Sequence, residues 1–173
     1  MFFIDSFMIR LGITSDINSV LNITKACGLH MVDNDILQWN ENYPDKASFV
    51  NDIEKKELYV YHNNGRVVAC ISLCNKMDDV YESVNWKTIN KNNLYIHRLA
   101  VHPEFQRKGL GKSLMDFAEN YAKDNKYISV RLDTFSENKR NLKFYESRGY
   151  HRLGKIYFLK QSVFPFYCYE LIL

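Results

Sequence analysis

The chain has 173 residues, of which 46% are hydrophobic, 25% charged and 14% aromatic, and this composition excludes a disordered or fibrous protein. A net charge of +3 is too small to argue for binding to nucleic acid. The length suits one domain over residues 1–173, with a core that needs no metal or disulfide.

The first elements follow from local patterns. Residues 7–12 are expected to form a strand. A helix should follow within residues 14–31, because apolar side chains recur there at helical spacing. Ser15 or Asp16 is expected to cap this helix, and Gly28 is expected to end it.

A second helix and a hairpin come next. Asp45, just after Pro44, is expected to cap a helix. Two runs rich in β-formers flank the pair Asn64-Gly65, which predicts a tight hairpin turn with positive φ. Residues 76–93 are mostly polar and are predicted to be a loop with a short helical turn.

The second half alternates between strand and helix patterns. The expected strands and helices are strands 93–101, 126–135, 150–159 and 164–173, and helices 109–125 and 137–149. This order predicts an α/β protein whose mixed sheet is covered by helices on both faces.

The cysteines and the N-terminus indicate the cellular setting. No CxxC pair or Cys/His zinc spacing is present, so no metal is expected. Cys70 and Cys74 lie in an apolar stretch and are predicted to be core residues in a reducing environment. The start MFFIDSFMIRLG lacks a basic n-region, and no stretch approaches the ~18 apolar residues of a membrane span. A soluble cytoplasmic protein is therefore expected.

The stretch QRKGLGKS at residues 106–113 has the composition of a phosphate-binding turn. A nucleotide-triphosphate loop needs Gly-x-x-x-x-Gly-Lys-Ser/Thr, and Gln106 stands where the first glycine should be. The other interpretation places Gly109 and Gly111 at a helix N-terminus, where free N–H groups and the helix dipole favour a pyrophosphate. A plain loop with a solvated basic face is the remaining alternative.

Two motifs in the right order favour the pyrophosphate. The stretch Gln106-x-x-Gly109-x-Gly111 resembles the acetyl-CoA signature of the Gcn5-related N-acetyltransferase (GNAT) family, and the block from Asn138 to Tyr150 resembles a second family motif. Asn141 stands where that motif usually has alanine. The segment from Trp39 to Pro44 is similar to one found in a group of small bacterial GNAT proteins.

The resemblance implies the GNAT fold, a mixed central sheet of about six to seven strands with helices on both faces. It also implies acetyl transfer from acetyl-CoA to a primary amine by direct attack in a ternary complex, with no metal. The residues it implies in acetyl-CoA binding are Leu99, Ala100, Val101, Gln106, Arg107, Lys108, Gly109, Leu110, Gly111, Lys112, Asn138 and Tyr145.

The catalytic residues follow from the chemistry of the transfer. Tyr145 resembles the family's general acid, and a phenol is protonated at neutral pH and can donate to the departing thiolate. His97 lies on the strand that leads to the cofactor and is a candidate general base. The residues expected to bind the acceptor are Trp39, Tyr43 and Trp86, because aromatic faces can hold a cationic amine, together with Glu41, whose carboxylate is a second candidate base.

Two alternatives remain beside the acetyltransferase. A non-enzymatic acyl-CoA-binding or regulatory module on the same fold would use the same cofactor residues. A P-loop ATPase would use residues 111–113 instead. The acceptor is not specified by the sequence, and a homodimer is an expectation that rests on the fold alone.

Overall fold

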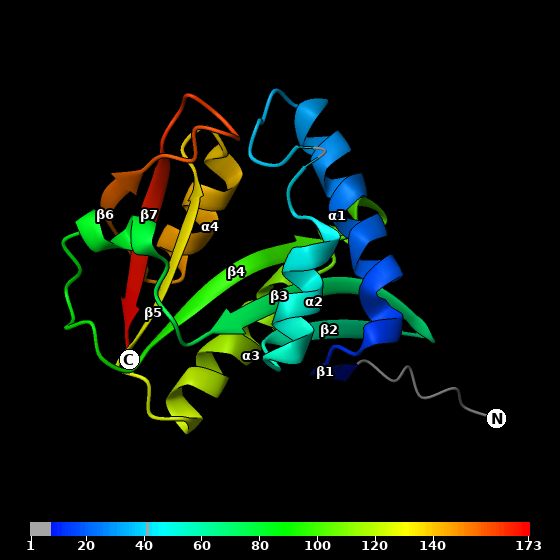
Figure 1. Ribbon diagram of the computed structural model, residues 1–173, viewed down its shortest axis with the longest axis horizontal. Helices are drawn as coiled ribbons and strands as arrows, with labels where there is room; N and C mark the ends of the chain where they lie inside the picture. The colour runs from blue at the N-terminus through cyan, green and yellow to red at the C-terminus, as the bar shows by residue number, and fades with distance from the viewer. Residues whose placement is uncertain (1–7, 41) are drawn as a thin grey trace.

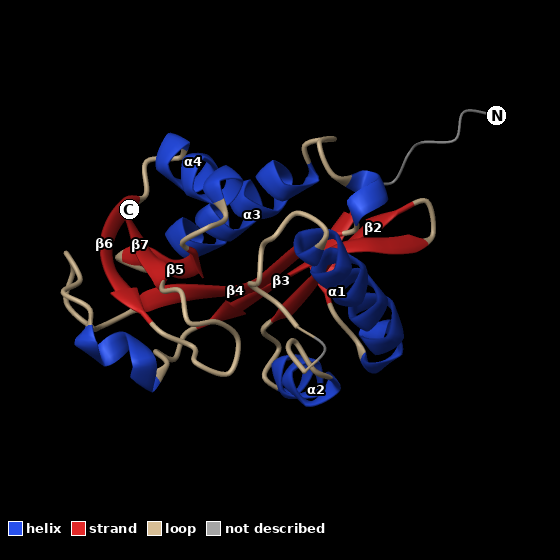
Figure 2. Cartoon of the chain, turned by 90° about the horizontal axis from the view of Figure 1, so that it is seen from above, coloured by secondary structure: helices blue, strands red, loops and turns tan. Residues whose placement is uncertain are grey.

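One twisted sheet of seven strands, in the order β1-β2-β3-β4-β5-β7-β6, organises the computed structural model, which describes residues 8–40 and 42–173 (Figure 1). The pair β4–β5 is parallel and the other pairs are antiparallel. Helices α3 and α4 cover one face, and α1 and α2 cover the other (Figure 2). The predicted mixed α/β architecture is confirmed.

The elements follow the predicted order. The strands are β1 (Met8–Leu11), β2 (Leu58–Asn63), β3 (Arg66–Cys74), β4 (Asn93–Val101), β5 (Ser129–Phe135), β6 (His151–Ile156) and β7 (Phe166–Ile172). The helices are α1 (Ile17–Val32), α2 (Lys46–Glu54), α3 (Leu110–Asp124) and α4 (Lys139–Ser147), with short 3₁₀ turns η1 (Thr14–Asp16), η2 (Asp79–Ser83) and η3 (Pro103–Phe105). No helix in the described part of the chain is long and apolar enough to cross a bilayer.

Local sequence signals set several boundaries. The turn between β2 and β3 has φ of 47° at Asn64 and 80° at Gly65, as the hairpin prediction requires. Asp45 caps α2, because its carboxylate accepts a hydrogen bond from the Ser48 N–H at 2.8 Å. Cys70 and Cys74 are buried, as predicted.

The prediction that Gly28 ends α1 is wrong, because the helix continues to Val32. Gly28 packs near Trp39, whose Cβ would lie 4.0 Å from an added Cβ. Tertiary packing thus outweighs the local cost of glycine in a helix, about 1 kcal/mol. Asp16 precedes α1 as predicted, but its carboxylate binds Arg10 and the Ile13 N–H rather than the helix amides.

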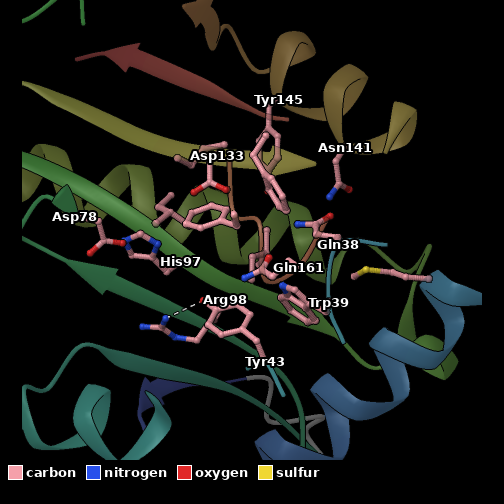
Figure 3. Close-up of a pocket in the computed structure, with 16 residues that line it drawn as sticks. Gln38, Trp39, Tyr43, Asp78, His97, Arg98, Asp133, Asn141, Tyr145 and Gln161 are labelled. Carbon is pink, nitrogen blue, oxygen red and sulfur yellow. Dashed lines mark hydrogen bonds and ion pairs between the residues drawn. The ribbon is translucent and has the colours of Figure 1, made fainter. Parts of the chain in front are cut away.

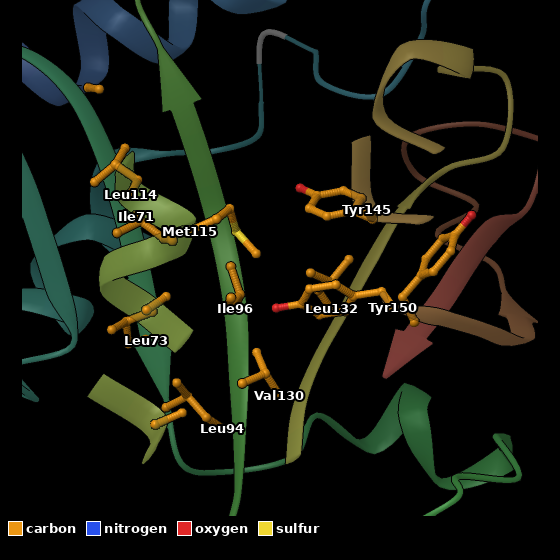
Figure 4. Close-up of a cluster of buried hydrophobic side chains, with 14 of the residues drawn as sticks. Ile71, Leu73, Leu94, Ile96, Leu114, Met115, Val130, Leu132, Tyr145 and Tyr150 are labelled. Atoms are coloured by element: carbon orange, nitrogen blue, oxygen red, sulfur yellow. The ribbon is translucent and has the colours of Figure 1, made fainter. Parts of the chain in front are cut away.

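The main core lies between the sheet and α3. Leu114 and Met115 of α3 pack on apolar side chains from three neighbouring strands, β3, β4 and β5 (Figure 4). These strand residues include Ile71, Leu73, Leu94, Ile96, Val130 and Leu132. This packing fixes the position of the α3 N-terminus relative to β4.

A buried ion pair holds the end of the sheet opposite that N-terminus. The Arg131 guanidinium donates to Glu170 at 3.0 Å, and both side chains are completely buried. Arg131 also donates to the Thr88 carbonyl at 2.7 Å and lies over the Trp86 ring at 4.4 Å. The pair therefore ties residues 86–90 to β5 and β7.

Arg131→Met should reduce the free energy of unfolding by about 3–5 kcal/mol, because Glu170 would keep a buried charge without its partner. Urea denaturation measures the change. The double variant Arg131→Met/Glu170→Met removes both charges and should recover a large part of the loss. Equal losses in the single and double variants would contradict a structural role for the pair.

Candidate active site

The site begins where β4 and β5 separate. Their parallel ladder joins residues 93–95 to residues 129–131, and beyond it the strands diverge (Figures 1 and 4). A bulge in β4 accompanies the separation: Ala100 pairs with Cys70 and His97 with Ser72, so the pairing register shifts between them. The diverging edge of β4 thus offers backbone groups to a ligand.

Arg98 occupies the bulge with a φ of 51°, a left-handed conformation that costs a side-chain-bearing residue energy. Its guanidinium donates two hydrogen bonds to the buried Asp52 of α2, at 2.6 and 2.7 Å. It also donates to the Tyr43 hydroxyl at 3.2 Å. Ser72 donates to the same carboxylate at 2.6 Å, so the bulge is anchored to α2 and β3.

A cavity of about 740 Å³ lies between the end of β4, the N-terminal ends of α3 and α4, and α1. It is lined by all but one of the predicted cofactor residues: Leu99, Ala100, Val101, Gln106, Arg107, Gly109, Leu110, Gly111, Lys112, Asn138 and Tyr145. The exception is Lys108, whose ammonium lies over the Phe105 ring at 5.1 Å. The distant motifs of the sequence are thus brought together around one space.

Gly109 forms the turn into α3. Its φ of 84° places it in the left-handed region as the N-cap residue, and nothing lies within 4 Å of a Cβ built there. Glycine is therefore favoured by the backbone conformation, and the space beside it is open. The first N–H groups of α3 lack helical partners and can bind an anion.

Two of the cationic side chains at this cavity, Lys112 and Arg140, already have partners within the protein. Lys112 pairs with Asp116 at 2.8 Å. Arg140 donates to the Gln106 amide oxygen at 3.2 Å, and the Gln106 amide nitrogen donates to the Val101 carbonyl at 3.0 Å. Arg140 and Lys143 of α4 line the cavity beside the predicted residues, and the sequence motifs did not single them out.

Two asparagines form the end of α4 that faces the site. The Asn138 side chain caps the helix by accepting from the Asn141 N–H at 3.1 Å, and it donates to Gln38 at 3.2 Å. Asn141, which stands at the position of the usual alanine, donates to Thr134 at 3.3 Å. An additional amide therefore lies on the cavity surface.

A second cavity of about 320 Å³ adjoins the first (Figure 3). The two share Met31, Leu99, Asn141 and Tyr145. Tyr145 is only 5% exposed, and burial raises the pKa of its hydroxyl. The phenol therefore keeps its proton at neutral pH and stands between the two spaces.

The predicted acceptor residues have different positions. Trp39 and Tyr43 line the smaller cavity. Glu41 lies outside the described residues. The structure corrects the position of Trp86, which packs on Arg131 and Tyr81 and does not belong to the lining of either cavity. Aromatic character alone could not show whether Trp86 lines a pocket or packs on a buried cation such as Arg131.

His97, the candidate base, also lines the smaller cavity. Burial, followed by the neighbouring Arg98 charge, lowers the pKa of its imidazole to about 4. The ring is therefore neutral at pH 7. Its low pKa makes it a poor acceptor of a proton from an alkylammonium, but the neutral ring keeps one nitrogen lone pair that can accept a hydrogen bond.

The smaller cavity contains two carboxylates that sequence patterns did not identify, Asp78 and Asp133. Burial and the charge of Asp78 raise the pKa of Asp133 to about 6, against the hydrogen bond from the Tyr81 hydroxyl. Asp133 lies in the middle of a strand in sequence. Only the divergence of β4 from β5 brings its side chain to a cavity.

Comparisons with known proteins agree with this geometry. Residues 26–150 match the acetyltransferase (GNAT) family. The chain is 22% identical over 152 residues to the uncharacterized N-acetyltransferase YesJ of Bacillus subtilis (strain 168), an alignment that covers 87% of this chain and 84% of YesJ.

Solved structures share the fold. A GNAT-family acetyltransferase from Streptococcus agalactiae 2603 superposes with a TM-score of 0.82 at 20% identity, over 96% of this chain and 95% of that one. YncA from Salmonella typhimurium, solved with its cofactor acetyl-CoA, gives a TM-score of 0.70 at 18% identity, over 96% and 94% of the two chains. The family match spans most of the sequence, and the chain belongs to the GNAT family of acetyltransferases.

Proposed function

We propose that this protein is an N-acetyltransferase that moves an acetyl group from acetyl-CoA to a primary amine by direct attack in a ternary complex. The position of Tyr145, between a cavity suited to the cofactor and a separate smaller cavity, carries the proposal. Two ligands can then meet beside one proton donor without leaving their own sites.

The larger cavity has the features that acetyl-CoA requires. The free N–H groups after Gly109 suit the pyrophosphate, since a helix N-terminus favours phosphate oxygens. Lys112, Arg140 and Lys143 add positive charge around it. Acetyl-CoA bound to YncA, which shares the fold, supports the same cofactor here.

The open edge of β4 supplies the next part of the mechanism. Backbone groups of residues 99–101 lie beyond the ladder with β5, so they can pair with the pantetheine arm as another strand would. A backbone N–H in this stretch would polarise the thioester carbonyl as negative charge develops on its oxygen. Acetyl-CoA supplies the activated acyl group when bound.

Tyr145 would then protonate the departing thiolate. Its raised pKa keeps the hydroxyl protonated, and the thiolate takes that proton as the C–S bond breaks. The smaller cavity favours this reaction over a role restricted to CoA binding, because a binding module needs no second site next to Tyr145. The P-loop alternative lacks its first glycine at Gln106.

Tyr145→Phe should lower kcat by about 100-fold or more, because a general acid contributes about 10²–10⁴. The Kd for CoA should change little, because only one oxygen is removed. Free-thiol release during acetylation of an amine panel, and calorimetry with CoA, measure the two quantities.

Tyr150→Phe is the matched control. Its ring packs 5.9 Å from that of Tyr145, but the residue is not in the lining of either cavity. This control should retain its kcat. Normal turnover in Tyr145→Phe would refute the assignment of Tyr145 as the acid.

Gly109→Ala should weaken CoA binding by about fivefold or more, because a side chain in the left-handed region costs about 1–2 kcal/mol and distorts the turn that presents the α3 amides. Gly65→Ala introduces the same strain at a φ of 80° in a distant hairpin. Both variants should lose similar stability in thermal denaturation, but only Gly109→Ala should lose CoA affinity in calorimetry. Equal affinities would exclude this turn as the pyrophosphate site.

A further inference from the structure

The two carboxylates of the smaller cavity lead to an inference about the amine that enters it. We propose that the acceptor is a small aliphatic diamine, with Asp133 receiving the ammonium that becomes acetylated and Asp78 and His97 holding the second ammonium (Figure 3). The inference rests on the proposed acetyltransferase function and names the class of its acceptor.

Asp133 defines the inner end of the site. It lies on β5 beside Tyr145 (Figure 3). The Tyr81 hydroxyl donates to one of its oxygens, and a carboxylate can accept further hydrogen bonds from a ligand. With a pKa of about 6, Asp133 is mostly ionised at neutral pH and can attract an ammonium and take a proton from it.

His97 and Asp78 define the outer end. The His97 side chain is only 10% exposed, and its Nε2 atom is buried without a hydrogen-bond partner among the described residues. A buried polar atom without a partner costs free energy, so a donor on the ligand would stabilise this site.

The Asp78 carboxylate lies at a suitable distance from that nitrogen. Its Oδ2 atom is 3.8 Å from His97 Nε2, too far for a direct hydrogen bond. One ammonium can donate to both atoms, because its N–H groups point in different directions and form bonds of about 2.8 Å. The Asp78 side chain is 59% exposed, which places this end toward solvent.

The rest of the lining suits a chain of methylene groups between two charges. Aromatic side chains form much of the wall: Trp39, Tyr43, Phe158 and Phe166. The lining contains one guanidinium, Arg98, and Asp52 already pairs with it through both carboxylate oxygens. The cavity therefore favours cations, and an acceptor with a distal carboxylate would be repelled by Asp78.

The transfer balances with these groups. The inner ammonium gives one proton to Asp133, and its nitrogen forms the new N–C bond as the thioester C–S bond breaks. Tyr145 protonates the sulfur, and the second proton lost by the nitrogen restores the Tyr145 hydroxyl. The products are the N-acetyl amine, free CoA and one proton, which passes from Asp133 to water.

The test compares matched acceptors with three to six methylene groups, using the full chain and acetyl-CoA. For each length the acceptors are the terminal diamine, the alkylamine and the amine with a terminal carboxylate. The kcat/KM of the best diamine should exceed that of its alkylamine by about fivefold, because an exposed carboxylate contributes modestly. The carboxylate analogue should be slower than both.

Two variants test Asp78 directly. In Asp78→Asn the ratio of kcat/KM for diamine and alkylamine should fall toward one. Asp79→Asn removes the same charge at the next position, which is exposed and outside the lining of the cavity, and should keep the ratio. Equal ratios in the two variants, or a carboxylate analogue as fast as the diamine, would overturn the inference and leave acetyl transfer intact.

If the proposed acetyltransferase function is wrong, the experiments should give a different result. If calorimetry detects CoA binding but none of the amines is acetylated, the transferase itself is excluded and the inference with it. Acetylated amines in the wrong order of preference exclude only the diamine.

The proposed role of Asp133 as proton acceptor is tested by the pH dependence of the reaction. The titratable or charged groups that line the cavity with it or interact with it are Tyr43, Asp78, Tyr81, His97, Arg98, Tyr145 and Cys168. With the diamine as acceptor, kcat/KM should rise with pH through about 6, because this ratio reports the free enzyme and the carboxylate is the form that takes the proton. In Asp133→Asn this rise with pH should disappear, and kcat should fall by about 100-fold. Asp133→Glu should restore part of kcat and part of the pH dependence. A rise that persists in Asp133→Asn would overturn the role of Asp133.

Discussion

The site depends on the bulge at Arg98. A regular β4 would continue its ladder with β5 and leave no space between them, whereas the bulge and the strand divergence open both cavities. Positive φ at an arginine is unfavourable without support. The support comes from Asp52, a completely buried carboxylate on α2 that accepts two hydrogen bonds from the guanidinium. Helix α2 therefore contributes to the site indirectly, because its Asp52 holds Arg98 in place.

Such an arrangement is costly, since a buried ion pair loses much of its attraction to desolvation. Its value here is geometric. Asp52 also accepts from Ser72 on β3, so one carboxylate fixes the neighbouring strand and the bulge together. The bidentate contact restricts the guanidinium in the way that a single hydrogen bond could not. The backbone of residues 99–101 consequently has a defined direction where it meets both cavities.

Local signals in the sequence predicted most elements of this fold. The bounds of β4, the Asn64-Gly65 turn and the Asp45 cap each depend on residues close in the chain, and all three are confirmed. The end of α1 was mispredicted because tertiary packing, which holds Met31 against the core cluster of Cys27 and Trp39, outweighs the preference of Gly28. Most of the lining of the larger cavity could be predicted because its residues lie in two compact motifs. Asp78 and Asp133 could not, because they are distant in sequence and meet only through the strand divergence.

The two cavities have opposite charge, and this difference can sort the two ligands of the proposed reaction. Lys112, Arg140 and Lys143 surround the larger space, whereas Asp78 and Asp133 line the smaller one. A phosphate-bearing cofactor is attracted to the first and repelled by the second, and a cationic amine shows the reverse preference. Leu99, Asn141 and Tyr145 lie at the boundary between them and carry no formal charge at neutral pH. The groups that lose and gain protons would therefore meet at a boundary where neither the positive potential of the larger cavity nor the negative potential of the smaller one dominates.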